Sequence, residues 1–104
     1  MNSEVFADEI TRSRRLATLR VLNENEGSAN ESVLRVALHQ LGFRGRNATD
    51  DGLRGDAEFL DKAELVIKEY YQGRVRTLVL SARGLAFLHR RVDPIPGIDY
   101  PDIA

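Results

Sequence analysis

Arginine dominates the basic residues of this 104-residue chain, because thirteen of its fifteen lysines and arginines are arginine. A planar guanidinium can pair with a phosphate or a carboxylate through two hydrogen bonds, so clustered arginines are candidate anion-binding groups. Several arginines fall within two short segments, residues 44–54 and residues 74–76. Together with one asparagine amide, they form the set of candidate contacts to a nucleic acid: Arg44, Arg46, Asn47, Arg54, Arg74 and Arg76.

Residue types that carry catalysis or bind metals are sparse. The chain has no cysteine, which excludes disulfides, thiolate zinc sites and cysteine nucleophiles. It contains no glycine-rich phosphate loop, HExxH pair or nucleophile elbow, and each of its two histidines, His39 and His89, stands alone. Residues 47–58 follow part of the spacing of a calcium-binding loop, but Asn47 replaces its first aspartate and helix capping explains Thr49. The sequence therefore predicts no enzyme activity, no metal site and no cofactor.

The formal net charge of −1 conceals alternating bands of charge. Residues 10–48 carry +4 and residues 65–92 carry +5, whereas residues 49–64 hold six acidic residues and carry −4. Basic and acidic bands in a nearly neutral chain are compatible with nucleic-acid binding through one face, and equally with self-association. The charge distribution alone does not choose between them.

Leucine spacing and glycine stops define the first two predicted helices. Leucines at i, i+3 and i+6 predict a helix over about residues 8–25 that ends before Gly27. Ser28, with Glu31 three residues later, forms a capping-box pattern, so a second helix is expected to follow Ser28 and to end at Gly42.

The second half of the chain combines helices with a hairpin. After a short turn, Thr49 is the expected N-cap of a third helix over residues 49–65. Two β-branched and aromatic runs, separated by Gln72 and Gly73, predict a β-hairpin. Ser81 is then the expected N-cap of a last helix.

This order of elements is that of a winged helix-turn-helix domain: three helices, a two-stranded wing and a C-terminal helix. The expected fold is therefore mainly α with a small β-hairpin. The stretch RRLATLRVLNENEGSANESVLRVALHQLGF resembles the opening of small winged-helix proteins encoded by Mu-like phages and prophages. The LVLSARG run and the PIPG tail resemble the same family. The resemblance implies a small DNA-binding or regulatory module.

The chain is expected to form one domain, residues 1–92, followed by a proline-rich tail, residues 93–104. The tail carries four large apolar residues, so it either packs back on the core or reaches a partner such as the second copy of a homodimer. These residues are Ile95, Ile98, Tyr100 and Ile103. The polar start MNSEVFADEI does not read as a signal peptide, and no apolar run approaches the ~20 residues needed to span a bilayer. A cytoplasmic protein without membrane contacts is expected.

A transcriptional regulator that contacts double-stranded DNA through the arginines of its turn and wing is the first functional prediction. Arg12, Arg14 and Arg15 of the first helix can add contacts to the DNA backbone. The acidic third helix argues against this prediction, because phosphates repel negative charge in the major groove. An alternative therefore stays open: a winged-helix protein–protein interaction or dimerisation module that does not bind DNA and whose acidic third helix meets a basic partner protein.

Overall fold

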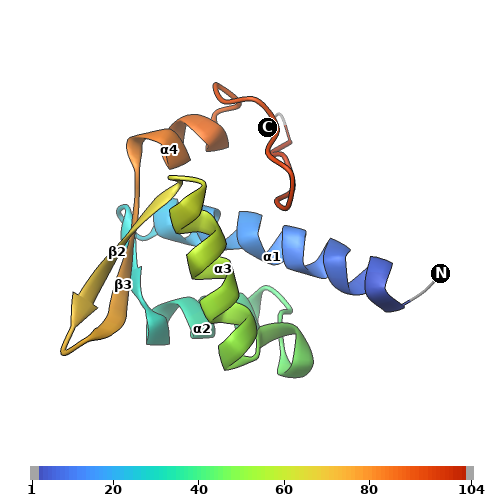
Figure 1. The fold of residues 1–104 in the computed structure, drawn as a ribbon, viewed down its shortest axis with the longest axis horizontal. Coiled ribbons are helices and arrows are strands. Elements are labelled where there is room, and N and C mark those ends of the chain that lie inside the picture. The colour runs from blue at the N-terminus through green and yellow to red at the C-terminus, as the bar shows by residue number, and fades with distance from the viewer. Residues whose placement is uncertain (1–2, 103–104) are drawn as a thin grey trace.

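The fold is mainly helical and includes a small antiparallel sheet (Figure 1). The computed structural model describes the backbone of residues 3–102 and the side chains of residues 7–74 and 77–102. Within this part of the chain, four α-helices, a short 3-10 helix and three strands follow in the order α1 (Ser3–Glu24), β1 (Ser28–Asn30), α2 (Glu31–Gln40), η1 (Gly45–Ala48), α3 (Asp50–Lys62), β2 (Val66–Tyr71), β3 (Arg74–Leu80) and α4 (Ala82–Leu88). No helix among these residues is long and apolar enough to cross a membrane.

Hydroxyl side chains cap α3 and α4 as the sequence predicts. The Thr49 hydroxyl accepts a hydrogen bond from the Gly52 N–H, at 3.1 Å, where α3 begins. The Ser81 hydroxyl accepts one from the Gly84 N–H, at 2.9 Å, where α4 begins. Both bonds satisfy backbone donors that a helix start leaves without an intrahelical partner.

The segment expected to open the second helix forms a strand instead. β1 pairs antiparallel with β3, and Ser28 lies opposite Val79. The capping box expected at Ser28 is therefore wrong: α2 begins at Glu31, and the Asn30 side chain accepts a hydrogen bond from the Val33 N–H at 2.9 Å. The added strand satisfies backbone groups along the edge of β3 that a hairpin alone would leave without partners.

The predicted hairpin is confirmed, but it belongs to a larger sheet. Gln72 and Gly73 connect β2 to β3, and both have positive φ angles, 51° and 78°, as a two-residue hairpin turn requires. The described sheet has three strands in the order β1-β3-β2, so the expected two-stranded wing is corrected to a three-stranded sheet. A register shift between Glu69 and Tyr70 interrupts the ladder near the turn.

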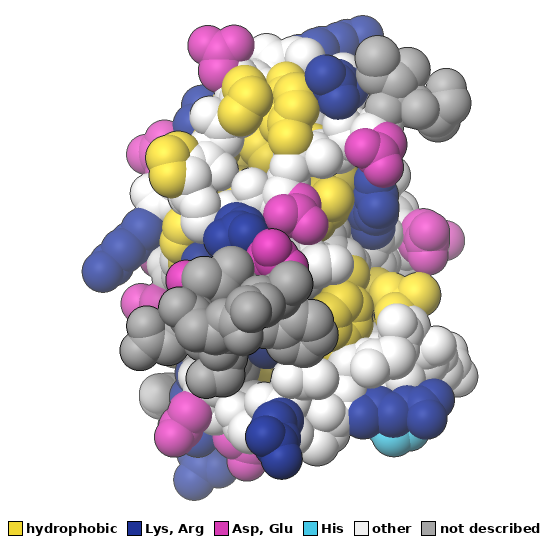
Figure 2. Space-filling view, turned by 90° about the vertical axis from the view of Figure 1, so that its right-hand side faces the viewer, with side chains coloured by type: hydrophobic (Ala, Val, Ile, Leu, Met, Phe, Trp, Pro, Cys, Tyr) yellow, Lys and Arg dark blue, Asp and Glu magenta, His cyan; other side chains and the backbone are white. Residues whose placement is uncertain are grey.

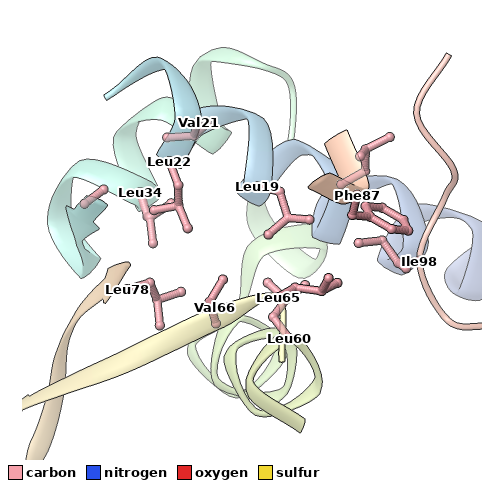
Figure 3. Packing of buried hydrophobic residues seen from close by; sticks show 12 residues of the cluster. Leu19, Val21, Leu22, Leu34, Leu60, Leu65, Val66, Leu78, Phe87 and Ile98 are labelled. Carbon is pink, nitrogen blue, oxygen red and sulfur yellow. The ribbon is translucent and has the colours of Figure 1, made fainter. Parts of the chain in front are cut away.

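The hydrophobic core extends along α1 (Figure 3). At one end Leu22 lies near Leu34 of α2 and Leu78 of β3, and at the other end Phe87 of α4 lies beside Ile98 of the tail. Burying each such side chain contributes about 1.5–3 kcal/mol. The cluster comprises Leu16, Leu19, Val21, Leu22, Ala29, Leu34, Leu60, Leu65, Val66, Leu78, Phe87 and Ile98.

The described part of the tail, residues 93–102, packs against α1 and α4. Arg15 of α1 donates a hydrogen bond from Nη1 to the Gly97 carbonyl, at 2.9 Å. The Tyr100 ring meets the phenylalanine of α4 edge-on, with 5.5 Å between the ring centroids. Ile103 lies outside the described residues. Through these contacts the tail completes one end of the core.

Candidate nucleic-acid interface

A buried carboxylate ties the acidic helix α3 to α1. Asp56 is 2% exposed and accepts hydrogen bonds from Nε and Nη2 of Arg14 and from Nε of Arg15, the last at 3.1 Å. Arg14 is 6% exposed and also donates from Nη1 to the Asn47 carbonyl, at 3.0 Å. Among the described side chains, every buried nitrogen or oxygen atom has a hydrogen-bond partner. The pair is thus fully satisfied, which a buried ion pair requires.

Three arginines of α1, namely Arg12, Arg14 and Arg15, contact other parts of the protein. Arg14 and Arg15 both bind Asp56, and the Arg15 guanidinium also stacks 4.1 Å from the centroid of the Phe59 ring. Arg12 lies 3.6 Å from the Asp99 carboxylate of the tail. The expectation that Arg14 and Arg15 contact a DNA backbone is therefore wrong, because both are bound to the buried Asp56. Arg12 keeps a partly exposed side chain, and its contact with DNA stays a prediction.

Two exposed ion pairs lie at the N-terminus of α3. The Asp50 carboxylate pairs with Arg35 of α2. The Asp51 carboxylate lies 3.2 Å from Nη2 of Arg54, one turn further along the helix. The side chains of Asp50 and Asp51 are 68% and 97% exposed, so both pairs are in contact with water. Surface pairs of this kind are weak and open readily.

Lys68 of β2 forms ion pairs with α3 in the C-terminal half of the helix. Its ammonium donates a hydrogen bond to the Glu58 carboxylate and lies 3.7 Å from the Asp61 carboxylate. The hydrogen bond and the charge of Lys68 lower the pKa of Glu58, and the same hydrogen bond raises the pKa of Lys68. This contact joins the helix to the hairpin.

The negative charge of α3 is therefore compensated by its neighbours. Each of its five acidic residues has a cationic partner, and four of the partner cations lie outside the helix. With the two basic residues of α3 itself, six basic side chains lie in the helix or against it, beside its five carboxylates. Figure 2 shows the same interspersion of basic and acidic side chains on the face around the N-terminal end of α1. The four partner cations are Arg14, Arg15, Arg35 and Lys68.

The three predicted contacts in the turn differ in accessibility. Arg44 is exposed and donates from Nε to the His39 carbonyl, at 3.1 Å, near the end of α2. Asn47 is half-buried, and its carbonyl accepts the bond from Arg14. Arg46 is exposed, and its side chain forms no hydrogen bond or ion pair with any described residue. Arg46 is thus the turn residue most available to an external anion.

Two of the other predicted contacts line a groove between α2, α3 and β3. Arg54 of α3 and Arg74 of β3 both line this groove, whose volume is about 790 Å³, and Arg35 of α2 lines it as well. Arg74 is exposed and without an ion pair to the described residues. The side chain of Arg76 lies outside the described residues. The apolar part of the lining includes Leu34, Leu38, Leu53 and Leu78.

Sequence reasoning missed Arg35 and Lys68. Arg35 lies beside the apolar stripe of α2 and pairs with Asp50, fifteen positions later, whereas Lys68 lies in β2, two positions after the buried Val66. Arg35 could have been predicted as a candidate contact. It lies on the polar side of the first helix of the expected helix-turn-helix pair, and this helix crosses the DNA backbone in such domains. The pairing of Lys68 with α3 had no comparable signal, because it depends on how the hairpin packs.

Comparisons with known proteins place the chain in a phage protein family. No family model and no solved structure matches it. The chain is 35% identical over 77 residues to the uncharacterized protein gp26 of Escherichia phage Mu, and the alignment covers 74% of this chain and 76% of that protein. This similarity supports the relationship to Mu-like phages that the sequence motifs indicate. The chain belongs to the family of the phage Mu protein gp26.

Proposed function

We propose that the protein is a winged-helix module that binds double-stranded DNA and regulates transcription. The observation that carries this proposal is the arrangement of a helix, a strand, two helices and a hairpin, with the sheet order β1-β3-β2. In such a domain α2 and α3 form the helix-turn-helix pair and the β2–β3 hairpin is the wing. The short strand β1 then joins the start of α2 to the wing.

Two accessible cations support the proposal from either side of α3. The helix packs against β2 along one side and against η1 at its start (Figure 1). Arg74 begins the second strand of the hairpin, and Arg46 lies in η1. Arginines that flank a recognition helix can bind phosphates on both edges of a groove, which positions the helix without reading sequence.

The charge of α3 is compatible with this docking. The five carboxylates of α3 that argue against DNA binding in the sequence are all paired with basic side chains. This pairing reduces the repulsion between the helix and a phosphate backbone. The same pairing reduces the acidic surface that the alternative, an interaction module, presents to a basic partner.

Salt-dependent DNA binding tests the proposal. We expect a labelled random duplex to bind in a fluorescence-anisotropy titration, with weaker binding as salt rises. Each phosphate contact contributes about 0.9 to the slope of log K against log salt, so the variant Arg46→Ala/Arg74→Ala should lose a slope of about 1.8. Between about 50 mM and about 200 mM salt, that difference amounts to about a 12-fold change in affinity.

Arg91→Ala is the matched control. Arg91 is an exposed arginine that follows α4, outside the turn, α3 and the hairpin. Its loss removes one positive charge, as Arg46→Ala or Arg74→Ala alone does. The slope of the Arg91→Ala variant should stay at the wild-type value, whereas each of those single variants should lose about 0.9. Equal slopes for all variants, or no binding even at the lower salt concentration, would overturn the proposed contacts.

A further inference from the structure

We propose that Asp50 and Asp51 restrain binding to generic duplex DNA by holding two groove arginines in ion pairs. The inference rests on the proposed function and gives these carboxylates a specificity-determining role. It concerns the first turn of α3, the part of a recognition helix that meets base edges in a helix-turn-helix complex.

Among the described side chains, three guanidinium groups line the groove between α2, α3 and β3, and they differ in their partners. Arg35 pairs with the Asp50 carboxylate. Arg54 lies 3.2 Å from the Asp51 carboxylate, and its Nε donates to the Asp50 carbonyl at 3.4 Å. Arg74 pairs with no described residue. Two of the three cations in the groove are thus already neutralised.

Carboxylates and phosphates compete for the same guanidinium. Both anions accept two parallel hydrogen bonds from arginine, so a DNA phosphate that binds Arg35 or Arg54 in this way must displace Asp50 or Asp51. The displaced carboxylates are tethered to the helix and remain close to the incoming phosphate. Because like charges placed together disfavour a complex, backbone contacts alone yield little affinity here.

Contacts to the bases can compensate for the repulsion between these carboxylates and the DNA phosphates. A carboxylate in the major groove accepts a hydrogen bond from the cytosine N4 amino group, which phosphates cannot offer. A duplex with suitably placed cytosines therefore converts the repulsive groups into contacts, and generic DNA does not. Asp56 does not take part, because it is buried between Arg14 and Arg15.

Neutralising the two carboxylates tests the inference. The variant Asp50→Asn/Asp51→Asn should bind a random duplex about 5-fold more tightly per carboxylate, the factor for two unit charges about 4 Å apart in water. Its salt slope should steepen by up to about 1.8, because Arg35 and Arg54 become available to phosphates. The thermal midpoint verifies folding, and Asp51→Asn alone serves if the double variant is unstable.

Asp93→Asn/Asp102→Asn is the matched control. Both residues are exposed in the tail, so the variant makes the same change in net charge away from α3. Tighter binding only for the Asp50/Asp51 variant supports the inference. An equal increase for both variants overturns it, because net charge then suffices.

The remaining outcomes separate the inference from the proposed function. If wild-type binding depends on Arg46 and Arg74 but the Asp50/Asp51 variant binds no more tightly, the inference fails and the proposed function stands. If neither protein binds duplex DNA, the proposed function fails and the inference fails with it.

Discussion

Asp56 is the acidic residue whose loss should cost the most stability. It is 2% exposed and accepts hydrogen bonds from Arg14 and Arg15, and Arg14 is itself 6% exposed. Asp56→Ala leaves the Arg14 guanidinium buried without its counter-charge, which costs about 3–5 kcal/mol. That is a large share of the ~5–15 kcal/mol by which a small domain is stable.

The expected change in thermal midpoint follows from the size of the chain. At about 2.1 cal/mol/K per residue, the unfolding entropy of 104 residues is about 0.22 kcal/mol/K. A loss of about 3–5 kcal/mol therefore lowers the Tm by about 14–23 °C. Thermal and urea unfolding followed by far-UV circular dichroism measure both quantities.

Two further variants identify the physical cause. Asp51→Ala removes a carboxylate that is 97% exposed, and it should cost about 1 kcal/mol or less. Arg14→Met/Asp56→Leu removes both buried charges, so it should recover most of the loss, because apolar side chains often replace a buried pair at little cost. If Asp56→Ala costs no more than Asp51→Ala, the buried pair does not hold α3 against α1.

Three more variants test how α4 and the hairpin pack against the rest of the protein. Gly84→Ala should cost about 1–3 kcal/mol or more by urea unfolding, because a Cβ at this position would lie 2.1 Å from the Leu65 carbonyl oxygen. Gly55→Ala, whose Cβ meets no atom within 4 Å, should instead stabilise the protein by up to about 1 kcal/mol, and equal effects would contradict this account. Lys68 lowers the pKa of Glu58 below its ordinary value of 4.5, so the stability that Glu58 contributes is present above that pH and is lost as the pH falls through the folded-state pKa. Glu58→Gln should therefore show a smaller loss of urea midpoint on acidification than the wild type, and parallel pH profiles would refute the contribution.

Local features were predictable because they depend on residues close together in the chain. Thr49 and Ser81 cap helices through the backbone N–H three residues ahead, and a window of four residues contains the whole signal. Gln72 and Gly73 likewise form the turn between two adjacent strands. The β1 strand was missed because three residues are too few to show alternation, and because Ser28 pairs with Val79, far along the chain.

Some features of the candidate site were also predictable from the sequence, and others were not. Residue types and spacing identified arginines near the turn and the hairpin, and the structure leaves Arg46 and Arg74 exposed without described partners. Sequence alone did not show that Arg14 forms a buried ion pair with Asp56, which lies 42 residues away. The groove was not predictable from the sequence either, because it is lined by three elements that are separate in the sequence.

The sequence by itself determined the helices, the caps of α3 and α4, the hairpin and the relationship to a Mu phage protein, since these depend on local patterns and on residue identity. Only the tertiary structure decided which charges face solvent. The acidic band at residues 49–64 predicts a repulsive helix, but packing places cations of α1, α2 and β2 against its carboxylates. The physical reason is that the net electrostatic field at the surface of a helix is the sum over all charges within a few ångströms. The fold decides which charges those are.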